Sequence, residues 1–81
     1  MSFKPELTKG FYRHYKGSMY EVIDLVQHSE TEEWLVLYRP CYGARGLWVR
    51  PFGMFIEQIE REGKRQPRFE YVPDYVEPDP S

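Results

Sequence analysis

The sequence predicts a mostly β domain: a small antiparallel barrel of five to six strands on the Src-homology-3-like plan, with one short helical turn near residues 51–55. Three observations support this prediction. Short segments rich in aromatic and β-branched residues alternate with turn signals. Only residues 51–55 read as a helical turn, with Pro at its start. The 81 residues suffice for one domain. An OB-type barrel is the alternative, but its usual helix between strands is not obvious in this sequence.

The first two predicted strands flank a tight turn. Residues 10–15 are rich in aromatic side chains and end at a turn signal in residues 16–18. Residues 19–27 alternate with a period of two, as a strand does. The face predicted to point one way contains Tyr20, Val22, Asp24 and Val26.

The third predicted strand is central. Residues 33–39 contain an apolar run, residues 34–38, which is typical of a strand covered on both faces. Pro40 ends it. Residues 42–46 contain two glycines and predict a hairpin connection to a short fourth strand at 47–50.

The last elements follow the helical turn. Residues 56–61 fit either a fifth strand or a short helix, because their two isoleucines also suit a helical face. Residues 62–65 predict a turn, and residues 68–72 predict a last strand by alternation. We expect a lead-in at 1–9, a single barrel domain at 10–72 and a mobile, acidic, Pro-containing tail at 73–81.

Composition limits the classes of function. The net charge of −2 gives no argument for a strongly basic phosphate-binding surface. Cys41 is the only cysteine, so no internal disulfide can form, and a reducing compartment is expected. No apolar run approaches the ~20 residues that span a bilayer, and the first residues lack a secretory apolar region. The predicted location is the cytoplasm, without membrane attachment.

Three polar-aromatic clusters lie at the edges of predicted strands, in residues 12–17, 28–31 and 48–51. A small barrel would bring such edges close together, where ligand sites usually lie. We therefore expect these clusters to form one binding surface. The candidate binding residues are Tyr12, Arg13, His14, Tyr15, His28, Glu30, Trp48 and Arg50.

Trp48 and Arg50 share a face if their segment is extended. If this face binds a ligand, Trp48 would stack on a planar group and Arg50 would bind an anion. Pro51 holds Arg50 extended, which would help to fix the guanidinium. The structural alternative is an Arg50–Glu ion pair with Trp48 closing one end of the barrel.

The two histidines raise the question of a metal or catalytic site. His14 and His28 are one ligand short of the usual catalytic zinc set, and Cys41 stands alone between Pro40 and Tyr42. The run from His28 to Glu30 has the residue types of a hydrolase, but consecutive side chains on an extended chain diverge. We expect no catalytic residue, no metal and no cofactor on this basis.

The clusters together resemble a widespread bacterial family of short proteins, catalogued as domain of unknown function 1653. The resemblance covers roughly residues 10–70 and implies a small bacterial domain that usually stands alone, with no established activity. The matching positions are Gly10, Tyr12 to Gly17, Tyr20, Val22, His28 to Thr31, Tyr38, Tyr42-Gly43, Trp48 to Pro51, Met54-Phe55 and Pro67 to Phe69.

Three functional hypotheses follow. The first is a non-enzymatic binding module that recognises a polar ligand, a peptide or a nucleic-acid element. The second is a small hydrolase or transferase that uses His14 or His28 as base with Glu30 as partner. The third is a structural or partner-docking domain. The chain is expected to be a monomer or a dimer paired through an edge strand.

Overall fold

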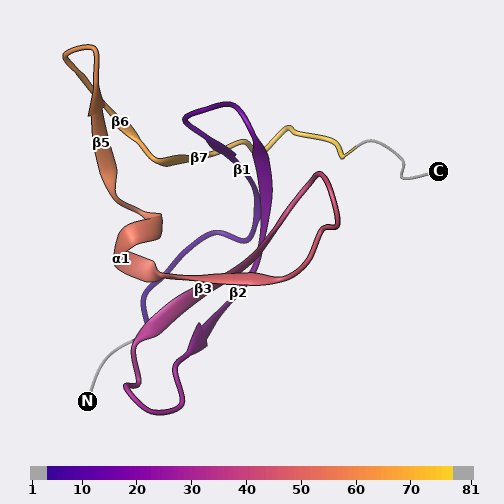
Figure 1. Cartoon of the computed structure of the whole chain (residues 1–81), viewed down its shortest axis with the longest axis vertical. Helices are drawn as coiled ribbons and strands as arrows, with labels where there is room; N and C mark the ends of the chain where they lie inside the picture. Colours follow the sequence, from indigo (N-terminus) through magenta and orange to yellow (C-terminus); the bar gives the residue numbers. More distant parts are fainter. Residues whose placement is uncertain (1–3, 78–81) are drawn as a thin grey trace.

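The structure, a computed structural model, describes residues 4–77. It confirms a mostly β, antiparallel domain (Figure 1). The elements in chain order are β1 (Gly10–His14), β2 (Met19–Gln27), β3 (Trp34–Pro40), β4 (Trp48–Pro51), α1 (Phe52–Phe55), β5 (Gln58–Arg61), β6 (Lys64–Pro67) and β7 (Phe69–Tyr71).

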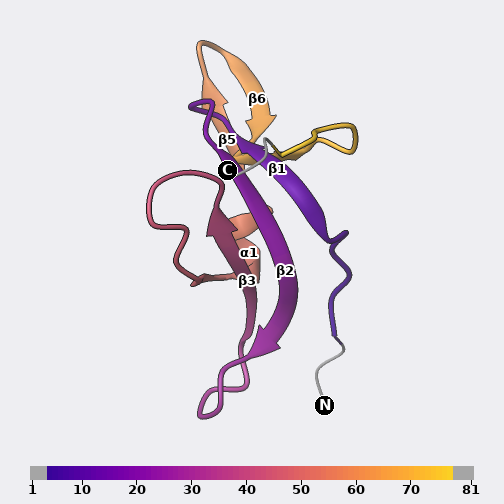
Figure 2. The same cartoon turned by 90° about the vertical axis from the view of Figure 1, so that its right-hand side faces the viewer.

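Five strands form one curved sheet in the order β4-β3-β2-β1-β7, while β5 and β6 form a separate hairpin (Figures 1 and 2). The predicted closed barrel is not found: in residues 4–77, β4 and β7 are the two edges of the sheet and no ladder joins them. The chain between these edges forms α1 and the hairpin instead. Phe55 of α1 fills the space beside the sheet, with its ring 4.2 Å from that of Phe69 on β7. Packing of Phe55 against β7 therefore takes the place of the hydrogen bonds between β4 and β7 that would have closed a barrel.

The helical turn predicted at 51–55 is confirmed as α1, which Pro51 precedes. The segment 56–61, for which the sequence allows strand or helix, contains β5. The turn predicted at 62–65 is shorter, because only Glu62 and Gly63 separate β5 from β6. Both residues have positive φ, 54° and 78°, as a two-residue hairpin turn of type I′ requires.

A β-bulge changes which side chains of β2 face the core. Val22 pairs with Tyr38, but Asp24 already pairs with Leu37, so one residue of β2 is extra. Leu25 consequently lies on the same face as Val22 and packs against the core. The predicted alternation, which put Asp24 and Val26 on the face of Val22, is therefore wrong beyond the bulge.

The core is built mainly from aromatic rings. Among residues 4–77, four of the six buried side chains are aromatic, which suits a short chain because each ring buries a large apolar area. Phe55 and Phe69 are stacked with an interplanar angle of 4°, and Phe55 also contacts the rings of Tyr12 and Tyr38. The buried residues are Tyr12, Val22, Val36, Tyr38, Phe55 and Phe69.

The segment after β7, residues 72–77, contacts the sheet. The Val72 amide donates to the Phe11 carbonyl at 2.9 Å, and the ring of Tyr75 lies 5.0 Å from that of Phe11. Glu77 then forms an ion pair with Arg45 in the loop between β3 and β4, whose tip this segment passes (Figure 1).

Residues 78–81 of the tail predicted to be mobile, and residues 1–3 of the lead-in, lie outside the described residues. Across residues 4–77, no helix has the length and apolar character needed to cross a membrane.

Candidate binding site

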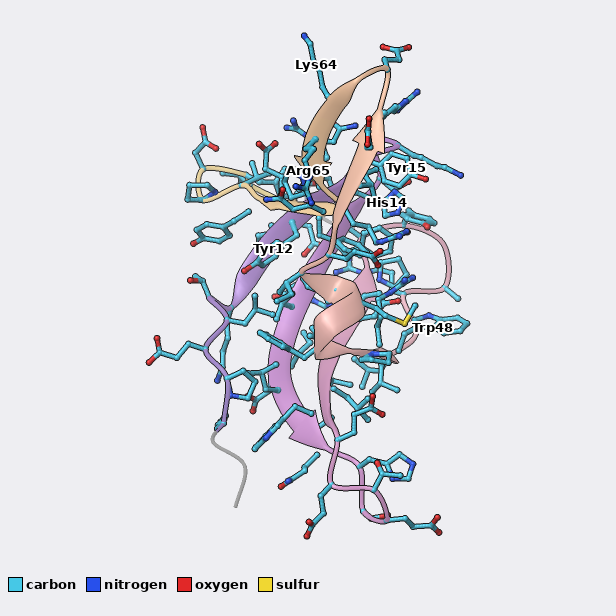
Figure 3. The ribbon with its side chains drawn as sticks, turned by 90° about the vertical axis from the view of Figure 1, so that its left-hand side faces the viewer. Tyr12, His14, Tyr15, Trp48, Lys64 and Arg65 are labelled. Atoms are coloured by element: carbon cyan, nitrogen blue, oxygen red, sulfur yellow. The ribbon has the colours of Figure 1, made fainter. Side chains whose placement is uncertain are left out.

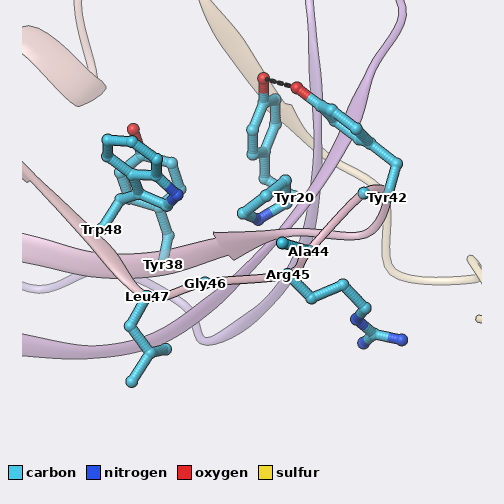
Figure 4. A pocket seen from close by; sticks show the side chains of 10 residues that line it. Tyr20, Tyr38, Tyr42, Ala44, Arg45, Gly46, Leu47 and Trp48 are labelled. Carbon is cyan, nitrogen blue, oxygen red and sulfur yellow. Dashed lines mark hydrogen bonds between the residues drawn. The ribbon is translucent and has the colours of Figure 1, made fainter.

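An open pocket of about 500 Å³ lies where the ends of β2 and β3 meet the β3–β4 loop (Figure 4). Its walls are mainly aromatic, and its remaining lining comes from the glycine-containing loop. The lining residues are Tyr20, Tyr38, Pro40, Tyr42, Gly43, Ala44, Arg45, Gly46, Leu47 and Trp48.

Two tyrosine hydroxyls meet at this pocket. The hydroxyl oxygens of Tyr20 and Tyr42 are 2.9 Å apart and share a hydrogen bond (Figure 4). Burial, followed by this hydrogen bond to Tyr42, raises the pKa of Tyr20 to about 12. The Tyr20 phenol is therefore neutral at physiological pH. The pair presents hydroxyl groups, which donate and accept hydrogen bonds, beside aromatic surface.

The pocket loop is held by the C-terminal segment. Arg45 has a positive φ of 57°, a conformation that is uncommon for residues other than glycine. Arg45 forms an ion pair with Glu77. The segment that contains Glu77 packs on the sheet, because Tyr75 contacts Phe11. The loop that forms one wall of the pocket is thus braced from outside the sheet.

Trp48 projects outward at the pocket (Figures 3 and 4). It pairs with Tyr38 across β3 and β4, and 60% of its surface is exposed. A side chain this exposed does not close the end of a core. Its indole ring instead offers a free face for stacking beside the pocket.

The first and third sequence clusters meet around the ring of Phe69. The His14 ring lies 5.0 Å from it, the Tyr20 ring 5.5 Å, and the Arg50 guanidinium 5.5 Å from its centre. Tyr20 also lines the aromatic pocket, so the pocket and this second group of side chains are continuous. Two of the three predicted clusters therefore come together.

Arg50 is the cation of this group without an acidic partner. Within residues 4–77 it forms no ion pair, and its Nε atom is buried without a hydrogen-bond partner. The Arg50–Glu pair considered as a structural alternative is not formed. Arg68 lies next to Phe69 and makes one long ion pair, 3.5 Å, with Glu57. Its Nε atom is likewise buried and unpartnered.

The environment of His14 favours its neutral form. Burial lowers its pKa, and the charges of Arg68, Arg50 and Lys16 lower it further. Its Nδ1 accepts a hydrogen bond from the Lys16 backbone amide at 3.2 Å. In the neutral ring Nε2 therefore carries the proton and is free to donate it to a ligand.

We expect the stability of the domain to fall as pH decreases through the range near 6.5. The unfolded chain protonates its histidine at about pH 6.5, whereas folded His14 does so at lower pH. The unfolded state then binds more protons, so the stabilising contribution of neutral His14 is present above pH 6.5 and is lost below it. Urea unfolding of the wild type and of His14→Gln between pH 5.5 and 8 measures this. The variant should have the flatter profile, and identical profiles would contradict the assignment.

The other candidates of the first cluster point in different directions. Tyr12 is 5% exposed, and its hydroxyl donates to the Thr8 carbonyl at 2.7 Å, so its ring belongs to the core. Arg13 is exposed and lies opposite Glu70 in the ladder between β1 and β7. Tyr15 packs on His14 at 4.4 Å between ring centres, and Figure 3 shows both at the end of β1. A binding role for these residues remains a prediction.

His28 and Glu30 lie at the far end of β2 from the pocket. Nδ1 of His28 accepts hydrogen bonds from the amides of Glu30 at 3.0 Å and Thr31 at 3.2 Å, which stabilises the turn between β2 and β3. His14 and His28 lie at opposite ends of β2, whose nine residues span roughly 25–30 Å. The structure therefore does not bring the second cluster to the other two. Across residues 4–77, no three His, Cys, Asp or Glu side chains gather as metal ligands.

Sequence reasoning missed five residues that build the site. Tyr20, Tyr38 and Tyr42 form pocket walls, and Phe69 and Arg68 complete the group beside it. A signal for them exists in the sequence, because all five belong to the motif positions of the family resemblance. The three tyrosines are separated in sequence, whereas Arg68 and Phe69 belong to the segment that is interpreted only as the last strand.

The fold and pocket define a small antiparallel β domain with an aromatic surface site. A model of the family described as "Protein of unknown function (DUF1653)" matches residues 10–71. The chain belongs to this family, which confirms the resemblance seen in its motifs. The crystal structure of a protein of this family from Bordetella bronchiseptica is similar, with 34% identity and a TM-score of 0.78, over 91% of this chain and 96% of that chain. No curated protein matches the chain.

Proposed function

We propose that this protein is a non-enzymatic binding module whose aromatic pocket takes a planar, ring-bearing part of a polar ligand. The observation that carries the proposal is the open pocket of about 500 Å³ walled by Tyr20, Tyr38, Tyr42 and Trp48. Such concave aromatic sites with a few placed polar groups are typical of ligand pockets. In this pocket the polar groups are the paired hydroxyls of Tyr20 and Tyr42.

Binding is favoured over acid–base catalysis by the position of the titratable groups. A general base must lie within hydrogen-bond reach of the proton that it takes. His28 and Glu30 interact within their own turn, at the opposite end of β2 from the pocket. The pocket itself is lined by tyrosine side chains and by Arg45, which Glu77 already engages. His14, the other base considered, is not among the lining residues of this pocket.

We also propose that the fold is an open variant of the Src-homology-3-like plan. In support, β1 to β4 form a meander, a short helical turn follows, and the last strand returns to pair with β1. The β5–β6 hairpin would then be an insertion before that last strand. Cys41, the only cysteine of the chain, fits a location in the reducing cytoplasm of a bacterium. Because β4 and β7 are edge strands, pairing of two copies through an edge stays a prediction, checked by sedimentation.

The test is a chemical-shift map of the ¹⁵N-labelled protein against nucleosides, nucleotides, short RNA and DNA strands, and peptides. Binding in the pocket should shift the amides of residues 42–48 and the indole N–H of Trp48. The indole N–H of Trp34, on the strand end near the β2–β3 turn, is the internal control. Saturable shifts confined to residues outside the pocket would refute the proposed site.

A further inference from the structure

A cationic group adjoins the aromatic pocket. Arg50 lies on the same face of β4 as Trp48, two residues further along, which places them roughly 7 Å apart along the strand. Tyr20 links the two groups, because it lines the pocket and also packs on Phe69 beneath Arg50. A ligand whose ring lies at Trp48 would therefore have its next group near Arg50.

Within residues 4–77, the charge of Arg50 is unpaired and that of Arg68 is paired only with the half-exposed Glu57. Arg50 has no carboxylate partner in residues 4–77, and the Nε atoms of Arg50 and Arg68 are both buried without hydrogen bonds. Burying such donors unpaired costs free energy, so native structures usually satisfy them. Their planar guanidinium groups match phosphate oxygens, to which they can bind in pairs. Because protein atoms cover both Nε atoms, an anion in this position would be bound by the outer nitrogens of the two guanidinium groups.

His14 supplies a third donor to the same place. It packs on Phe69 from the end of β1, while Arg50 approaches the same ring from β4. With Nδ1 engaged by the Lys16 amide, its Nε2–H is the remaining polar atom of the ring. Two acidic groups lie near this set: Glu57, whose carboxylate is half exposed and pairs with Arg68, and Glu70, which lines a small pocket together with His14. His14 and Arg50 therefore approach the same ring, and the positive charges of Arg50 and Arg68 both act on His14.

Resting on the proposed function, we infer that Arg50, Arg68 and His14 form an anion subsite beside the aromatic pocket, and that the ligand is a phosphorylated ring compound of the nucleotide class. The ring stacks on Trp48 and the phosphate takes the donors around Phe69. A free nucleotide and a single-stranded nucleic acid offer the same chemistry. Stacking supplies ring affinity with little base preference, and the arginines recognise the phosphate.

The experiment compares four probes on the full chain by NMR titration and calorimetry. They are adenosine, adenosine 5′-monophosphate, inorganic phosphate and a single-stranded oligodeoxyadenylate of six residues. The variants are Arg50→Gln and Arg68→Gln, with Arg65→Gln on the exposed β6 strand as the charge-matched control. Thermal unfolding of each variant establishes that it is folded, and the second arginine variant serves if the first is not.

We expect the monophosphate to bind at least tenfold more tightly than adenosine. Arg50→Gln and Arg68→Gln should remove this advantage and leave adenosine binding unchanged, while Arg65→Gln should behave as the wild type. An oligonucleotide that binds at least tenfold more tightly than the monophosphate, with a steeper salt dependence, would identify a strand as the source of the phosphate. Equal affinities for the monophosphate and the oligonucleotide would identify a free nucleotide.

The two proposals fail in different ways. Equal affinity for adenosine and its monophosphate would overturn the anion subsite and leave the aromatic pocket standing. Phosphate shifts at Arg50 and Arg68 without any binding of adenosine would refute the ring pocket and support the subsite. If none of the four probes shifts either group, the nucleotide class is refuted.

Discussion

Replacing Phe55 by Ala should destabilise the domain by about 3–5 kcal/mol, the range typical of large-to-small substitutions of buried aromatic residues. Phe55 is 1% exposed and stacks on Phe69 with ring centres 4.2 Å apart. A chain of this length has a total stability of only about 4–12 kcal/mol. The variant should therefore unfold at a much lower urea concentration, and equilibrium unfolding followed by circular dichroism measures it.

The size of this effect follows from where Phe55 lies. The sheet is open, and β4 and β7 are not hydrogen-bonded to each other in residues 4–77. Phe55 contacts Phe69 on β7, Tyr38 on β3 and Tyr12 on β1, so one ring joins three strands of the sheet. Its loss removes the packing that takes the place of barrel closure.

Met54→Ala is the matched control, because Met54 occupies the same helical turn and is 48% exposed. A surface substitution of this kind should change the stability by less than about 1 kcal/mol. If Phe55→Ala and Met54→Ala unfold at the same urea concentration, α1 does not anchor the core, and the role of Phe55 in joining the strands is refuted.

How much of the fold the sequence predicts depends on whether the signal is local. The helical turn after Pro51, the interior position of the third strand and most strand segments follow from local composition and are found, whereas β6 is not predicted. The bulge in β2 does not follow from a strict period of two, although the polar Asp24 interrupts the predicted apolar face that contains Val22 and Val26. Only pairing with β3 reveals the extra residue. Barrel closure is likewise an inference from strand number, whereas the contacts of Phe55 with the edge strand arise only in three dimensions.

The candidate site shows the same division. Strand periodicity places Trp48 and Arg50 on one face, and their pairing with Tyr38 and Val36, both core residues, agrees with this. The grouping of His28 with the other clusters rests on the assumption that all strand edges of a small barrel lie near each other. In an antiparallel sheet, however, the two ends of a nine-residue strand are at opposite ends of the molecule. Strand direction, which cluster composition does not contain, decides which edges meet.

The core and the pocket share their aromatic residues. Tyr38 is a buried core side chain and also a wall of the pocket. Tyr20 packs on Tyr38 at 5.6 Å and on Phe69 at 5.5 Å while its hydroxyl reaches Tyr42. Substitutions at these positions would therefore mix losses of stability with losses of binding. A clean test of the proposed function needs a pocket residue that contributes little to the core.

Trp48 meets this requirement, and we expect Trp48→Ala to weaken binding of a ring-bearing ligand by about 5- to 150-fold, the equivalent of ~1–3 kcal/mol for one stacked base. Adenosine 5′-monophosphate, titrated calorimetrically, is the ligand with which to measure it. Because 60% of Trp48 is exposed, the midpoint of urea unfolding should change little. Trp48→Phe keeps an aromatic face and should recover part of the affinity.

Val49→Ala separates stacking from general disturbance of β4. Val49 is adjacent to Trp48 and 52% exposed, but as the next residue of the strand it points to the opposite face. We expect this variant to bind like the wild type. Equal losses in both variants would show that β4 supports binding only by its backbone, and unchanged affinity in Trp48→Ala would place the ligand elsewhere. Loss in Trp48→Ala alone, with stability retained, would assign the indole ring to the ligand rather than to the fold.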